Sequence, residues 1–171
     1  FPSKLKALFI LPELVKEISK QGHEIASHAY KHLNLTALTP TQIKNQIEKS
    51  NKILDKLTKQ KILGFRAPNF DINTKILRIL EKYYKYDSSI HPAIVPGYYY
   101  NFKYSLTPYY NNKMLEIPIS VIPIIRFPIS WLWMRNLGNW LTNIGINVNI
   151  KKRNVILYFH AWEFTKIPKV K

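Results

Sequence analysis

The stretch Gly-His-Glu-Ile-Ala-Ser-His-Ala-Tyr-Lys-His, residues 22–32, decides the fold. The alternating residues 23–27 predict a short strand, and Gly22 ends a helix predicted over residues 11–20. The strand runs directly into His28 and His32, four residues apart. Two neutral imidazoles at this spacing can bind one metal ion, although catalytic metal sites usually need a third protein ligand.

Helices and strands alternate along the rest of the chain. Thr39 and Pro40 predict the start of a second helix that ends near Lys59, and Asp71 or Asn73 is expected to cap a third. Further strands are expected at residues 62–65, 84–86, 114–119 and 155–159, a helix at 129–144 that ends at Gly145, and a long loop at 91–112. The first helix is expected to bury Leu14, Val15 and Ile18.

Each polar cluster of the chain directly follows a predicted strand. The clusters contain His28 with His32, Arg66, Asp87 and His160. The alternating order predicts parallel strands with helices outside, and in such α/β folds the catalytic groups gather at the carboxyl ends of the strands. We therefore expect the four clusters to meet at one rim and to form an enzyme site.

Composition limits the remaining choices. The 171 residues are 46% apolar and suffice for one domain, residues 1–171. The absence of cysteine excludes disulfides and thiolate metal sites, and leaves the compartment undetermined between cytoplasm and cell envelope. The net charge of +16 comes from scattered lysines, so we expect no nucleic-acid partner. An acidic polysaccharide or a peripheral contact with anionic lipid is a reasonable partner for such a surface.

The apolar run at residues 115–134 approaches the length of a membrane span. Because it contains Glu116, Arg126 and three prolines, we expect a strand, a Pro-rich loop and an amphipathic helix instead. The alternative is a segment at a lipid interface that carries Trp131, Trp133 and Trp140.

Four ordered motifs of the chain resemble one known family, the polysaccharide deacetylases with a NodB-homology domain, carbohydrate esterase family 4. They are His-Glu-Ile-Ala-Ser-His-Ala-Tyr-Lys-His (23–32), Gly-Phe-Arg-Ala-Pro-Asn-Phe (64–70), Tyr-Asp-Ser-Ser-Ile (86–90) and Leu-Tyr-Phe-His-Ala-Trp-Glu-Phe (157–164). Within that family, the motifs look most similar to the branch associated with exopolysaccharide loci.

The resemblance implies a distorted (β/α) barrel and a metal-dependent hydrolase that removes N-acetyl groups from amino sugars in a polysaccharide or glycan. The implied metal is divalent, usually zinc, with His28 and His32 as ligands. The family's Asp-Asp motif, which supplies the base and a third ligand, has no match here. We therefore expect a barrel that lacks its first strand, with the motif upstream of Phe1, and little activity from these residues alone.

The resemblance also implies roles for three further residues. His160 is the implied general acid, Arg66 the residue that orients the base, and the backbone N–H of Asn69 the donor that stabilises the oxyanion. A general acid must carry a proton, so a nearby carboxylate should raise the pKa of His160, and Asp87 is the candidate. Trp162 is the candidate to line the sugar groove, because flat aromatic rings suit pyranose faces.

Each of these residues also has a structural interpretation, as a core histidine, a turn arginine, a turn-capping aspartate or a core tryptophan. A non-catalytic carbohydrate- or lipid-binding relative with a degenerate site is the alternative function.

Overall fold

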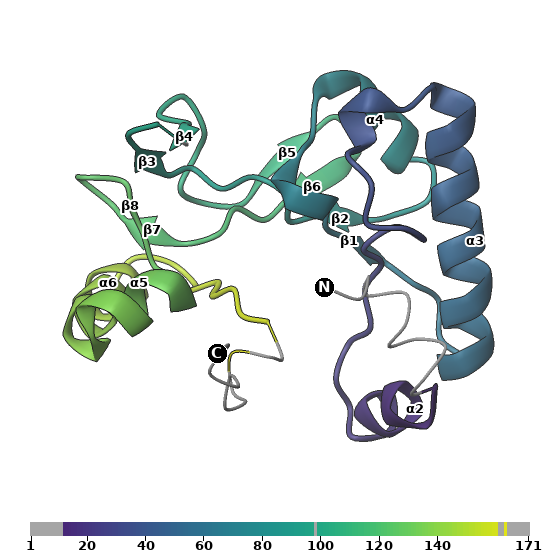
Figure 1. Ribbon diagram of the computed structural model, residues 1–171, viewed down its shortest axis with the longest axis horizontal. Coiled ribbons are helices and arrows are strands. Elements are labelled where there is room, and N and C mark those ends of the chain that lie inside the picture. The colour runs from purple at the N-terminus through teal and green to yellow at the C-terminus, as the bar shows by residue number, and fades with distance from the viewer. Residues whose placement is uncertain (1–11, 98, 161–162, 164–171) are drawn as a thin grey trace, which may run out of the picture. The chain divides into compact units, whose positions relative to one another are not determined.

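The computed structural model describes residues 12–97, 99–160 and 163 (Figure 1). The chain forms two compact units, and each is described on its own. The first comprises Phe1–Ser89 and Tyr109–Ile117, and the second comprises Ile90–Pro108 and Pro118–Lys171.

A four-stranded sheet forms the centre of the first unit. Its order is β1 (Gly64–Phe65), β2 (Tyr86–Asp87), β6 (Met114–Glu116) and β5 (Tyr109–Asn111). The pairs β1–β2 and β2–β6 are parallel, and β5 is antiparallel to β6. Ser27 extends the sheet by one parallel bridge beside Phe65. The predicted parallel α/β arrangement is therefore confirmed here, although the strands are shorter than predicted.

Helices α3 (Pro40–Thr58) and α4 (Thr74–Leu80) begin as the sequence predicts. Thr39 caps α3 in a capping box with Gln42, and Pro40 takes the first position, where a missing N–H costs nothing. Asn73, one of the two expected caps, accepts from the Ile76 N–H at the start of α4. The core of this unit includes the buried residues Ile43, Ile47, Phe65, Ile76, Leu80 and Met114.

Helix α2 (Pro12–Lys20) ends at Lys20 as predicted, but two of the three residues of its predicted buried stripe are exposed. Leu14 is 52% exposed and Ile18 is 36% exposed, whereas Ser19 is buried. Val15 and Ser19 lie one turn apart, so the face that packs inward is rotated away from Leu14. Apolar spacing alone could not choose between these two faces.

The described residues of the second unit form two antiparallel hairpins and two helices. Strand β3 (Ile94–Val95) pairs with β4 (Tyr99–Tyr100), and β7 (Val121–Ile122) pairs with β8 (Phe127–Pro128). The first hairpin and strand β5 lie within the loop predicted over residues 91–112, whereas residues 101–108 are outside any helix or strand, so that prediction was correct only in part.

The single helix predicted over residues 129–144 is two helices, α5 (Trp131–Leu137) and α6 (Asn139–Ile150). The break falls at Gly138, where φ is 84°, a value that favours glycine. Gly145, predicted as the stop, instead lies inside α6 and is buried against Ile129. Of the strand predicted at 155–159, the structure has one parallel bridge between Tyr158 and Ser130.

Among the described residues, no helix is both long and apolar enough to span a membrane. The apolar run at 115–134 contains the end of β6, the β7–β8 hairpin and the start of α5, as expected for a folded segment. Trp133 packs against Phe127, with ring centroids 4.7 Å apart.

Candidate functional site

The carboxyl ends of the parallel strands in the first unit carry the predicted polar residues. His28 follows the Ser27 bridge, Arg66 follows β1, and Asp87 ends β2. Glu116 ends β6 and is paired in register with Asp87. The parallel pairing aligns these ends at one edge of the sheet, as the sequence predicts for this unit.

His28 is held in one orientation by the neighbouring strand end. Its Nδ1 lies 2.6 Å from the backbone oxygen of Arg66. A carbonyl oxygen can only accept, so Nδ1 carries the proton and Nε2 carries the lone pair of the neutral ring. This is the arrangement in which a backbone carbonyl fixes a metal-binding histidine.

His32 lies beside His28, with ring centroids 5.1 Å apart in an edge-to-face arrangement. Both rings line a pocket of about 220 Å³ whose other walls come mostly from apolar side chains, among them Val15, Ile25 and Leu54. His28 is half-buried and His32 is exposed. The two imidazoles therefore sit together at a wall that solutes can reach.

Arg66 is anchored to the loop after β2. Its Nε donates to the Ser88 carbonyl at 2.8 Å, and its Nη2 donates to Ser88 Oγ at 2.8 Å. Ser88 Oγ in turn donates to the Ile117 carbonyl at 2.8 Å. The guanidinium is thus fixed by two bonds to one residue, which is buried.

Asp87 is fully buried and accepts two hydrogen bonds from Ser89, from its N–H to Oδ2 and from its hydroxyl to Oδ1. Burial raises the pKa of Asp87, while hydrogen bonds from Glu116 and Ser89 and the charge of Arg66 oppose that rise.

Asn69 lies in a short 3-10 turn, Pro68–Phe70, with an exposed side chain and φ at 56°. Phe70 follows at φ 60°, and Ala29, directly after His28, has φ 61°. Left-handed conformations at non-glycine residues cost free energy and cluster at functional sites. They lie here on the two loops that carry His28 and Arg66.

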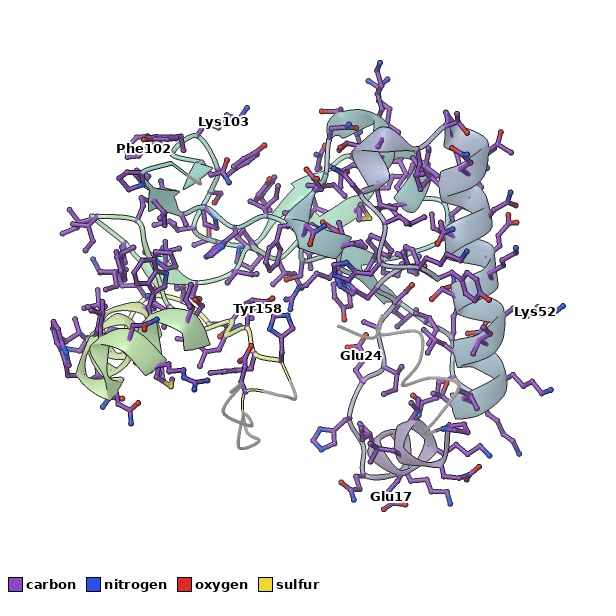
Figure 2. All side chains as sticks on the ribbon, in the orientation of Figure 1. Glu17, Glu24, Lys52, Phe102, Lys103 and Tyr158 are labelled. Atoms are coloured by element: carbon purple, nitrogen blue, oxygen red, sulfur yellow. The ribbon has the colours of Figure 1, made fainter. Side chains whose placement is uncertain are left out.

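His160, in the second unit, is held by two side chains. Its Nδ1 pairs with Glu163 Oε1, and its Nε2 lies 2.6 Å from the hydroxyl of Tyr158, which is labelled in Figure 2. The sequence analysis proposed Asp87 as the carboxylate that pairs with His160, whereas in the structure the carboxylate of Glu163 contacts the His160 ring. The spacing in the sequence could have indicated this pair, because Glu163 lies three residues after His160 and its N–H bonds to the His160 carbonyl.

Ser88, Ser89 and Glu116 are the other site residues that the sequence analysis missed. The two serines follow Asp87 directly, where hydroxyls commonly bond to nearby backbone and side chains. Trp162, the predicted sugar-groove residue, lies outside the described residues.

His28 and His32 fit two of the four ligand positions of a tetrahedral zinc site. Neutral imidazoles are the nitrogen ligands that zinc prefers, and the carbonyl bond to His28 fixes the ring. Within residues 12–97, 99–160 and 163, no group of three or more His, Asp or Glu side chains is placed to hold an ion.

Comparison with known proteins agrees with this geometry. The family model "Polysaccharide deacetylase" matches residues 4–86, which include the His28/His32 motif and the Arg66 motif. The match covers slightly less than half of the chain. It confirms the predicted resemblance to the polysaccharide deacetylases over the segment that carries the first two motifs.

Three relatives of this chain show the degree of similarity. A peptidoglycan-N-acetylglucosamine deacetylase of Bacillus cereus is 37% identical over 84 residues, 49% of this chain and 28% of its own length. A Helicobacter pylori peptidoglycan deacetylase is 33% identical over 50% of this chain and 30% of its own. A peptidoglycan deacetylase-like protein of Gibberella zeae is 29% identical over 70% and 38%. The chain thus spans less than two-fifths of the length of each.

Solved structures confirm the fold. A Mycobacterium smegmatis protein assigned to the polysaccharide deacetylases aligns over 90% of this chain and 55% of its own, with TM-score 0.59 and 20% identity. A carbohydrate esterase family 4 pseudoenzyme from Bacillus anthracis aligns over 88% and 40%, with TM-score 0.56 and 14% identity. The fold is therefore the NodB-type (β/α) barrel in incomplete form, as predicted.

Proposed function

We propose that this chain is part of a metal-dependent hydrolase that removes N-acetyl groups from the amino sugars of a polysaccharide such as peptidoglycan. The observation that carries the proposal is the hydrogen bond from His28 Nδ1 to the Arg66 carbonyl beside the ring of His32. It joins two motifs of the deacetylase family at one sheet edge. The names of the relatives support an N-acetylated glycan as the substrate.

His28 and His32 are the proposed ligands of a divalent ion, most simply zinc. Zinc would supply Lewis-acid polarisation of the acetamide carbonyl. Arg66, held by Ser88, is the proposed positioning residue for the base. The exposed Asn69 turn offers a backbone N–H for the oxyanion, which is the role that we propose for it.

His160 is the proposed general acid. A carboxylate on Nδ1 favours the imidazolium, which is the form with a proton to donate to a departing amine. The proton would leave from Nε2, and the hydroxyl of Tyr158 lies within hydrogen-bond distance of that atom. We also propose a catalytic role for Asp87, whose carboxylate accepts two hydrogen bonds from Ser89.

Acetate release from N-acetylglucosamine oligomers and from peptidoglycan tests the function, with the complete natural protein before and after chelation and zinc addition. We expect zinc to restore release, and His28→Gln or His32→Gln to lower it by about a hundredfold or more. His23→Gln is the matched control, because His23 is exposed in the same segment and has no proposed role.

Equal acetate release by the His28→Gln, His32→Gln and parent proteins would refute the metal ligands. Binding of the glycan by the zinc-loaded protein with no acetate release would refute the hydrolase and favour a carbohydrate-binding relative. The basic surface suggests a second, anionic partner, either a glycan or a membrane.

A further inference from the structure

Helix α6 of the second unit buries three polar or small residues and exposes several apolar ones. Thr142, Gly145 and Asn149 are buried and lie on one face. Ile144 is 45% exposed and Val148 is 44% exposed. This is the reverse of the usual pattern for a helix at a protein surface.

Specific contacts fix this orientation. Asn149 Nδ2 donates to the Val121 carbonyl at 2.9 Å and to the Gly145 carbonyl at 2.7 Å. At Gly145 an added Cβ would lie 2.5 Å from Ile129 Cδ1, so only glycine permits this close approach. The helix therefore cannot turn its apolar face inward without losing a buried hydrogen bond and a tight packing contact.

The outward face carries an apolar stripe, defined as Trp140, Ile144 and Val148, beside the exposed Asn143 and Asn147. The spacing of four residues places the three apolar side chains along one side of the helix. Trp140 is 60% exposed. An apolar stripe of this kind marks an interaction site more often than isolated exposed residues do.

The charge around the stripe is of one sign. Glu163 is the sole acidic residue in 90–108 and 118–171, which together carry nine Lys and Arg. The Glu163 side chain is nearly buried and paired with His160, so it offers little negative charge to solvent. Lys151 and Lys152 are exposed directly after α6, and Lys151 continues the line of the stripe.

We propose that the α6 stripe docks on the surface of an anionic phospholipid bilayer. An apolar helix face with tryptophan and flanking lysines is the pattern of a helix that lies in the membrane interface. Each lysine near an anionic leaflet strengthens binding severalfold, and a second, equally basic copy of the same unit would be repelled. This inference is independent of the deacetylase function.

Vesicle co-sedimentation of the full chain tests the proposal, with phosphatidylglycerol-containing vesicles against pure phosphatidylcholine. We expect binding to the anionic vesicles that is about tenfold weaker in Ile144→Asn/Val148→Asn and about tenfold weaker in Lys151→Glu/Lys152→Glu. Leu14→Asn/Ile18→Asn is the matched control, because it removes exposed aliphatic side chains from α2. It should bind like the parent.

Trp140 gives a direct report of insertion. Brominated lipids should quench part of the tryptophan emission of the parent chain, and Trp140→Phe should lose that part. The proposal is overturned by the absence of binding to anionic vesicles, or by equal binding of the stripe variant and the parent. Concentration-dependent dimerisation that the stripe variant abolishes would assign the surface to a second copy and would also overturn it.

Discussion

Removal of the Ser88 hydroxyl should destabilise the first unit by about 2.5–3 kcal/mol. In the structure this hydroxyl accepts from Arg66 Nη2 and donates to the Ile117 carbonyl, both at 2.8 Å. A bond to a charged group contributes about 1.5–3 kcal/mol and a neutral bond about 1 kcal/mol. The Nε bond of Arg66 to the Ser88 carbonyl survives in Ser88→Ala, so we take the lower part of the summed range.

Urea unfolding followed by circular dichroism measures this loss as a shift of the midpoint at unchanged slope. Ser105→Ala is the control, because the Ser105 hydroxyl bonds to Thr107 within its own exposed turn. It should cost less than about 0.5 kcal/mol. A double-mutant cycle between Ser88→Ala and Arg66→Ala should give a coupling of about 1.5 kcal/mol or more. Coupling near zero would refute the serine as the anchor of the guanidinium.

Three further changes test other parts of the molecule. Burial raises the pKa of Asp87 above its usual 3.8, so its protonated form favours folding at low pH, and this contribution is lost as the pH rises through the raised pKa. In Asp87→Asn the midpoint of urea unfolding should therefore depend less on pH in that range than in the parent. The same pH dependence in both proteins would contradict the raised pKa of Asp87. Gly145→Val should cost about 1–3 kcal/mol in thermal unfolding, because its Cβ would meet Ile129 Cδ1 at 2.5 Å, whereas no loss would show that α6 packs differently. Glu163→Gln should move the imidazole titration of His160, followed by NMR, to lower pH, because the carboxylate that favours the imidazolium is gone; an unmoved titration would contradict the ion pair.

The sequence predicted the first unit well because its signals are local. Thr39, Pro40 and Asn73 act through neighbouring backbone groups, so the starts of α3 and α4 follow from the sequence alone. The positions of His28 and Arg66 after parallel strands followed from the alternation of elements. The roles proposed for these residues stay predictions.

The predictions that failed depend on tertiary packing. The sequence predicted that Gly145 ends a helix. In the structure Gly145 instead lets α6 pack closely against Ile129, a contact that its neighbours in the sequence do not indicate. Leu14 has the spacing of a core residue, yet it is exposed because Ser19 sets the inner face of α2. The choice of Glu163 as the partner of His160 depends on the turn that follows Tyr158, and strand patterns do not specify that turn.

Anomalous diffraction from crystals of the zinc-loaded protein, collected on both sides of the zinc edge, tests the central claim most directly. We expect a peak about 2.0–2.1 Å from Nε2 of His28 and from one ring nitrogen of His32. The same measurement on His28→Gln should show that peak weakened or lost. Zinc bound elsewhere in the parent protein, with no peak beside these two rings, would contradict the assignment of the metal site.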